Sequence, residues 1–252
     1  FEDFQTNEIV ELNEQRYIGI DLNPSCIGIS VHDNGKILET KEFNFREINQ
    51  KAIHLGKPNS SKEFKYLQNK LNYELIHISK QISILQKHYK CKYVFCEKLN
   101  LENKDHHNGK IYNRIVNNLW KRTQFIQNLD KRIKLNNGKL IQVYPQYTSF
   151  IGNMMHDYTD PINASIEIAR RGFESVIAKN KDRFYPTFNI DSLKDQWKEY
   201  FDESLETWKK FYTKAKNLKL KYRVSSEESK IPFEVFSLNQ AKKSQVKVYD
   251  FY

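Results

Sequence analysis

Three acidic residues in this chain have types and positions that suit a metal site. Asp21 and Glu97 each end a short apolar run, and Asp160 stands directly before Pro161. A carboxylate at the end of a buried strand is costly to remove from water unless a positive charge compensates it. Because carboxylate oxygens are the hard ligands that Mg²⁺ and Mn²⁺ prefer, the three acids together predict a divalent-metal site.

Each acid, taken alone, also has an interpretation without chemistry. Asp21 could begin a turn with the Asn–Pro pair that follows it, as aspartate often does after a strand. Glu97 could be a half-exposed residue that pairs with a neighbouring lysine. Asp160 could stabilise the start of a helix, since aspartate favours the N-cap and proline the first helical position. Only the joint placement of the three favours a site.

The apolar pattern predicts the elements that must hold these acids in place. Three strands joined by tight turns come first, and the Asn34–Gly35 pair tolerates the positive φ that a hairpin needs. Strands then alternate with helices whose apolar residues recur every three or four positions. The predicted strands cover 17–20, 26–32, 36–45, 92–96 and 140–144, and the predicted helices cover 64–85, 115–133 and 160–176.

An antiparallel meander followed by alternating helices and strands indicates an α/β fold, with a mixed sheet and helices packed on it. This order is the ribonuclease-H-like layout. In it, the first strand, the fourth strand and the last core helix lie side by side at one end of the sheet, so the three acids converge. Converging carboxylates repel one another unless cations neutralise them, and two divalent ions about 4 Å apart can hydrolyse a phosphodiester.

Composition divides the chain into four segments. Residues 1–15 form a polar, acidic lead-in, and 16–180 carry the predicted α/β core. Aromatic residues at helical spacing and many lysines predict a basic helical appendage over 181–224. Residues 225–252 form a C-terminal tail in which short strands are expected.

The chain is strongly basic, with 41 Lys and Arg against 31 Asp and Glu and a net charge of +10 over 252 residues. This excess favours a polyanionic partner, either nucleic acid or an acidic membrane surface. An AT-rich genome would also raise the lysine content, so charge alone does not decide. No apolar stretch approaches the roughly 20 residues of a membrane span, and no signal peptide is recognised. We therefore expect no membrane partner and a cytoplasmic location.

Only three cysteines are present, Cys26, Cys91 and Cys96, and none belongs to a CxxC pair. The odd number and the spacing argue against a disulfide framework and against a structural zinc site. We therefore expect no zinc.

Four motifs of this chain resemble the RuvC-like nuclease domain, most closely that of the TnpB transposon proteins and the type V CRISPR effectors. They are Ile18–Asn23, Cys96–Leu99, Tyr147–Ser149 and Asp160–Ser165 with Arg170–Gly172. The resemblance covers roughly residues 16–173. It implies an RNA-guided DNA endonuclease that cuts with Mg²⁺ (or Mn²⁺) through Asp21, Glu97 and Asp160 as catalytic metal ligands.

The chain departs from the family pattern in two places. Many relatives carry a four-cysteine zinc element before the last acid, whereas Phe150–Thr159 contains no cysteine. Relatives also commonly place that acid two residues before the asparagine, where this chain has Pro161. Asp160 lies three residues before Asn163, and Asp157 is the fallback ligand. Two alternatives therefore stay open: an RNA-guided DNA-binding protein that does not cut, and a junction resolvase that needs no guide.

The guide-RNA and target-recognition modules of the family usually lie N-terminal to the nuclease domain. Only about fifteen residues precede Arg16 in this chain. We therefore expect either that the chain is the C-terminal fragment of a longer protein or that a separate subunit supplies recognition, and we favour the fragment.

Several basic residues are candidates for contact with nucleic-acid phosphates. Arg114, Lys121 and Arg122 belong to the basic second helix, which could equally be a solvated helix face. Arg170 and Arg171 follow the last motif on the last core helix, which favours them as phosphate contacts.

Three further polar residues have two interpretations each. Asn163 could position a ligand or substrate, or could cap a turn of the helix. His106 and His107 could be metal ligands, but adjacent histidines in a polar loop are more often exposed to solvent.

Overall fold

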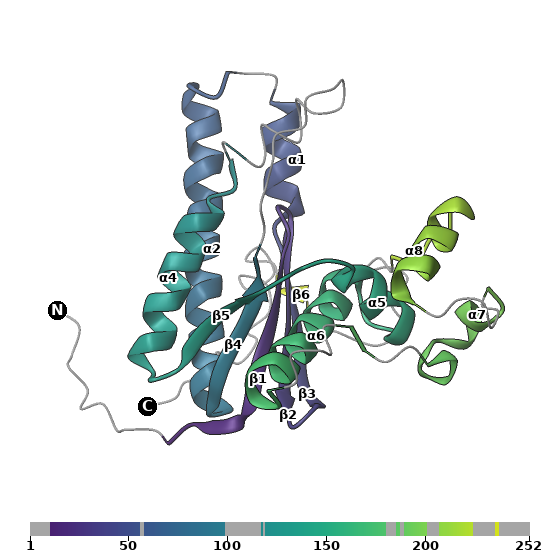
Figure 1. Ribbon diagram of the computed structural model, residues 1–252. Coiled ribbons are helices and arrows are strands. Elements are labelled where there is room, and N and C mark those ends of the chain that lie inside the picture. The colour runs from purple at the N-terminus through teal and green to yellow at the C-terminus, as the bar shows by residue number, and fades with distance from the viewer. Residues whose placement is uncertain are drawn as a thin grey trace.

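The computed structural model describes residues 11–55, 58–98, 117, 119–179, 185–186, 189–200, 207–223 and, for the backbone alone, 235–236. Its centre is a six-stranded sheet in the order β5-β4-β1-β2-β3-β6 (Figure 1). The strands are β1 (Asn13–Leu22), β2 (Cys26–Asp33), β3 (Lys36–Asn44), β4 (Cys91–Glu97), β5 (Lys139–Val143) and β6 (Val235–Phe236).

The pairing of these strands confirms the predicted α/β class with a mixed, ribonuclease-H-like sheet. Strands β1, β2 and β3 form an antiparallel meander, whereas β4 runs parallel to β1 and β5 runs parallel to β4. The predicted hairpin forms at Asn34–Gly35, with φ angles of 46° and 87°. Strand β1 begins at Asn13, four residues earlier than predicted, because its polar first residues still pair with β4 and β2.

Helices α2 (Lys62–His88) and α4 (Arg122–Leu135) cover one face of the sheet, and α1 (Arg46–His54) packs against α2. Helix α2 begins after Ser61, whose side chain accepts a hydrogen bond from the Phe64 N–H and so caps the helix. None of the described helices, α2 included, is both long and apolar enough to cross a bilayer. The apolar positions of α2 recur every three or four residues, at Phe64, Leu67, Leu71, Leu75, Ile78, Ile82 and Leu85.

Helix α6 (Asp160–Gly172) lies directly on the opposite face of the sheet (Figure 1). Two glycines permit this close approach. A Cβ atom at Gly19 would lie 2.1 Å from the Ser165 carbonyl oxygen, and one at Gly28 would lie 2.1 Å from the Pro161 carbonyl oxygen. No side chain fits at such distances in a close-packed interior. The helix therefore contacts the backbones of β1 and β2, and most of its residues are buried.

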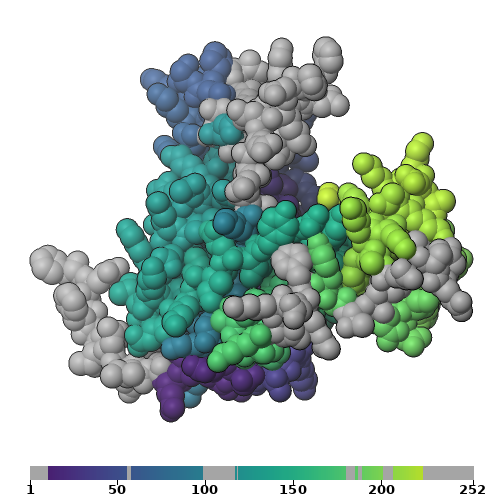
Figure 2. Space-filling view, viewed as in Figure 1, coloured from purple at the N-terminus to yellow at the C-terminus, as the bar shows by residue number. Residues whose placement is uncertain are grey.

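A second group of helices forms a lobe beside the sheet: α5 (Thr148–Met155), α7 (Asp195–Lys198) and α8 (Trp208–Asn217). Figure 2 shows α7 and α8, in green and yellow, standing out to one side. The lobe has an aromatic core of its own, and α5 belongs to it, so the predicted helical appendage is built partly on a helix from the 16–180 segment. The described residues also form two short helices, the π-helix η2 (Phe173–Ile177) and the 3₁₀ helix η3 (Ile190–Ser192).

Candidate active site

Asp21 and Glu97 lie side by side at the carboxyl ends of two neighbouring parallel strands. The residues just before them are in register between β1 and β4, so the two acids stand at the same level of the sheet. Gly19 and Phe95, two positions earlier on each strand, contact α6, so both carboxyl groups point to that face. Their exposed fractions are only 3% and 5%. The structure thus brings together two of the three predicted acids.

Burial and mutual repulsion dominate the electrostatics of this pair. Burial raises the pKa of Asp21 well above its usual range, and the Glu97 charge, a hydrogen bond between the two carboxyl groups and the Asp160 charge raise it further. The Leu22 N–H donates to Glu97 Oε1 at 2.9 Å, and the Asn23 amide donates to Asp21 Oδ2 at 2.5 Å. Two like charges cannot both persist in a dry site without a cation. These hard oxygen donors therefore fit Mg²⁺ or Mn²⁺.

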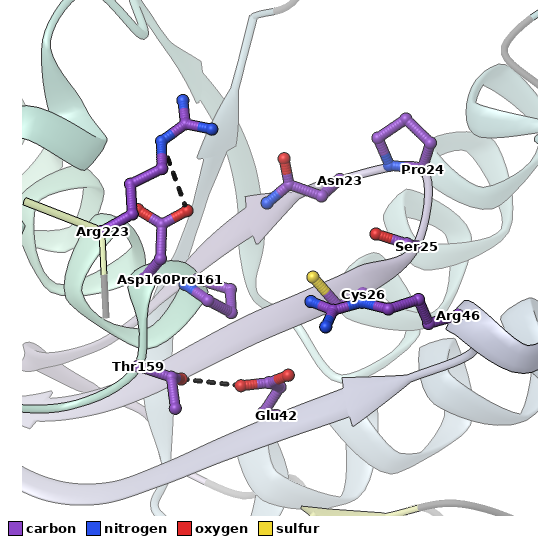
Figure 3. A pocket seen from close by; sticks show the side chains of 10 residues that line it. All are labelled: Asn23, Pro24, Ser25, Cys26, Glu42, Arg46, Thr159, Asp160, Pro161 and Arg223. Carbon is purple, nitrogen blue, oxygen red and sulfur yellow. Dashed lines mark hydrogen bonds and ion pairs between the residues drawn. The ribbon is translucent and has the colours of Figure 1, made fainter. Parts of the chain in front are cut away.

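Asp160 is the first residue of α6 and the third acid of this region. The N-cap position belongs to Thr159, so Asp160 is not the capping residue of the helix. Its Oδ1 atom accepts a hydrogen bond from Asn153 Nδ2 at 2.6 Å, and Arg223 Nε lies 3.9 Å from Oδ2 (Figure 3). Burial raises the pKa of Asp160, while the Arg223 charge and the Asn153 hydrogen bond oppose the rise.

Two buried asparagines hold Asp160 in this position. Asn163 donates from Nδ2 to Asn153 Oδ1 at 3.0 Å and to the Tyr158 carbonyl at 2.7 Å, and its Oδ1 accepts from the Tyr158 N–H at 3.1 Å. Asn153 donates in turn to the Ser149 carbonyl and to Asp160. Asn163 is therefore linked to Asp160 through Asn153, which was not predicted because it belongs to none of the four motifs.

The third acid does not complete a compact metal-binding group. Over the ranges that the structure describes, no three His, Cys, Asp or Glu side chains lie close enough together to hold an ion. The Glu97 and Asp160 charges both raise the pKa of Asp21, the Glu97 charge more strongly. The fallback ligand Asp157 is half exposed and pairs with Lys194 at 3.3 Å. A three-acid site would require Asp160 to approach the other two.

A fourth acid, Glu42 on β3, belongs to the same region and was not predicted. It is buried, and it accepts a hydrogen bond at 2.6 Å from Oγ1 of Thr159, the residue before Asp160. Glu42 stands opposite Gly28 in the sheet and so points to the α6 face. Strand alternation could have indicated this, because the neighbouring Phe43 belongs to the apolar face. Its partner, 117 residues away, has no signal in the sequence.

The predicted phosphate contacts divide between the two faces of the sheet. Arg170 and Arg171 both donate to Glu167 at 2.8 Å; the Arg171 side chain is only 2% exposed, whereas that of Arg170 is 23% exposed. Lys121 is exposed and Arg122 half-buried at the start of α4, on the face away from α6. Outside the described residues lie Arg114, His106 and His107.

Comparison with known proteins gives fold-level likeness alone. No family model matches the chain, and no curated protein matches it. Among solved structures, it is similar to the Cas12f1–sgRNA–target DNA complex, with 12% identity and a TM-score of 0.44 over 62% of this chain and 50% of that one. The chain thus spans about half the length of that protein.

A second likeness is to Thermus thermophilus RuvC in complex with a Holliday junction substrate, with 8% identity and a TM-score of 0.41 over 65% of this chain and 96% of that one. A CRISPR-Cas12f ternary complex follows, with 14% identity and a TM-score of 0.36 over 71% of this chain and 35% of that one. Identities and scores of this size say nothing of the reaction, which has to be inferred from this chain's own residues.

Proposed function

We propose that this chain is a RuvC-like nuclease domain that hydrolyses DNA phosphodiester bonds with two bound divalent ions, Mg²⁺ or Mn²⁺. The observation that carries the proposal is the pair Asp21 and Glu97. Two buried carboxyl groups lie at the ends of adjacent parallel strands, where burial and the Glu97 charge raise the pKa of Asp21, and a cation would offset the repulsion between them.

Each of the three acids would have its own role in metal binding. Asp21 and Glu97 would hold the metal, while the Leu22 N–H and the Asn23 amide keep one oxygen of each carboxyl group in place. Asp160 would be the third ligand, with Asn153 orienting one of its oxygens. When bound, divalent ions in such a site activate a water molecule and stabilise the leaving oxygen.

We further propose that the domain works under the direction of a guide RNA, in a protein related to TnpB. The motifs in the sequence support this, together with the net charge of +10, which suits two nucleic-acid partners. The Cas12f1 complex to which the chain is similar contains an sgRNA and a target DNA. Recognition modules would then lie on a longer protein or on a separate subunit.

The test replaces one carboxylate at a time with an amide of the same size, which removes the negative charge. Asp21→Asn and Glu97→Gln should each abolish Mg²⁺-dependent cleavage of DNA and leave DNA binding intact. Asp130→Asn, on the exposed side of α4 where Asp130 pairs with Lys134, is the matched control and should cleave normally. Unchanged cleavage by either site variant would sink the proposal.

Metal binding is measured separately, by thermal unfolding with and without Mn²⁺. A bound ion raises the melting temperature in proportion to the logarithm of its concentration. We expect this rise in the wild-type protein and its loss in Asp21→Asn.

A binding protein that does not cut is the second candidate. It is favoured by one observation: the described residues contain no compact group of three acids, since Asn153 and Arg223 hold Asp160 apart. That candidate predicts DNA binding without cleavage and no effect of Mn²⁺ on the melting temperature.

A further inference from the structure

A polar cavity of about 200 Å³ opens beside the acids, between the start of α6, the start of β2 and the end of β3 (Figure 3). Asp160 and Glu42 line it, together with Asn23 from the turn after β1. Its volume is below the about 300–1,000 Å³ of pockets that enclose a drug-sized ligand. The cavity therefore suits a small polar group rather than a whole nucleoside.

Two arginines from distant parts of the chain enter this cavity. Arg46 is the first residue of α1, and Arg223 follows α8 in the lobe. Figure 3 shows their guanidinium groups approaching from opposite sides, Arg223 over Asp160 and Arg46 toward Cys26 and Glu42. Both arginines are largely exposed at the mouth of the cavity, so a ligand from solvent can reach them.

Neither arginine is committed to a strong ion pair. Arg223 lies 3.9 Å from Asp160 and its side chain is 68% exposed, which makes the pair weak and too long for a hydrogen bond. Arg46 has no ion-pair partner among the residues that the structure describes. By contrast, the buried Arg171 is bound to Glu167 and to the Tyr144 carbonyl.

We propose that Arg46 and Arg223 form a seat for one backbone phosphate of DNA, directly beside Asp160. The planar guanidinium fork matches the geometry of phosphate oxygens, and two forks from opposite sides would hold the group between them. The identity of the ligand rests on the proposed function. The seat lies on the α6 face, whereas the predicted contacts Lys121 and Arg122 lie on the other face and would bind a different part of the nucleic acid.

The proposal is tested by the salt dependence of DNA binding, measured in EDTA so that no cleavage occurs. The probe is a fluorescently labelled single-stranded DNA. Each phosphate contact that is lost lowers the slope of log K against log[salt] by about 0.7 for a single strand. Arg46→Ala and Arg223→Ala should each show this decrease, and the double variant about twice as much. Arg46→Lys and Arg223→Lys should retain the slope, because the charge remains.

Two lysines near the arginines serve as matched controls. Lys51 lies on α1 but is paired with Glu47, and Lys221 is exposed two residues before Arg223 without lining the cavity. Lys51→Ala and Lys221→Ala should leave the slope unchanged. Unchanged slopes in either arginine variant, equal decreases in the controls, or no binding of the wild type at low salt would each overturn the seat.

The two measurements, DNA binding and DNA cleavage, test the phosphate seat and the nuclease proposal independently of each other. If the arginine variants lower the slope but no DNA is ever cleaved with Mg²⁺, the seat stands and the nuclease proposal falls. If the wild type cleaves DNA and the arginine variants bind with unchanged slopes, the nuclease proposal stands and the seat falls.

Discussion

The two faces of the sheet differ in the polar groups that they bury. Toward α2 and α4 the side chains that these strands bury are apolar: Ile18, Ile20, Leu22, Ile27, Ile29, Val31, Phe43, Val94 and Cys96. Toward α6 the same strands present the apolar Tyr17 and Phe95, and beside them glycines and buried polar groups, Gly19, Asp21, Gly28, Ser30, His32, Glu42 and Glu97. Apolar burial stabilises the fold, whereas each buried polar group costs free energy unless it is hydrogen-bonded. The first face therefore offsets the cost of positioning the acids on the second.

The largest effect is expected on the apolar face. Leu71→Ala removes a fully buried side chain of α2 and should lower the free energy of unfolding by about 2–5 kcal/mol, measured by urea denaturation. Leu135→Ala, at a position that is 76% exposed, should change it by no more than about 0.5 kcal/mol. If the apolar face stabilises the fold without contributing to the metal site, the Leu71→Ala protein should still bind Mn²⁺ under conditions in which it is folded.

A side chain at Gly28 tests the other face. Its Cβ atom would meet the Pro161 carbonyl, so Gly28→Val must displace the start of α6 and should cost about 3 kcal/mol. Because Asp160 moves with the helix, cleavage should fall much further than in a Leu71→Ala protein of similar stability. Gly35→Asn is the control, since nothing lies near that position and Asn tolerates its positive φ. Normal cleavage by Gly28→Val would contradict the close contact.

The hydrogen bond between Thr159 and Glu42 can be removed without changing volume. Thr159→Val leaves Glu42 buried without that donor and should cost about 1–3 kcal/mol in chemical denaturation. Thr213→Val removes a comparable hydroxyl that bonds a backbone carbonyl on exposed α8, and should be nearly neutral. Equal losses in the two variants would mean that Glu42 does not anchor the start of α6.

The smallest expected change is in the free energy of unfolding per pH unit, and it comes from His32. Burial lowers the pKa of His32 from 6.5 to about 3, so the folded protein keeps the ring neutral while the unfolded chain takes up a proton. The free energy of unfolding should therefore fall as pH drops through this window, by at most about 1.4 kcal/mol per pH unit. His32→Gln should flatten this dependence in a series of melting curves, whereas His54→Gln, on exposed α1, should not.

The sequence predicted what depends on local pattern and on chain order. The alternation of apolar residues predicted the strands. The order of the elements along the chain was enough to predict that Asp21 lies beside Glu97. The Glu167–Arg171 pair also had a signal in the sequence, because residues four apart on a helix are neighbours.

The surroundings of Asp160 could not be predicted, because they depend on contacts between segments far apart. Glu42 and Thr159 are 117 residues apart, and Arg223 comes from the lobe. Hydrogen bonds of this kind follow from how the helix sits on the sheet, which periodicity does not report. The glycines that allow the helix to sit there are visible in the sequence, but their partners are not.

Helix α5 has a consequence for regulation at a distance. Its Phe150 belongs to the aromatic core of the lobe, and three residues later Asn153 holds Asp160. The same helix also meets α6 through backbone contact, since a Cβ at Gly152 would lie 2.2 Å from the Asn163 carbonyl oxygen. Any molecule that tightens or loosens the lobe would therefore change how firmly the third acid is held, without touching the acids themselves.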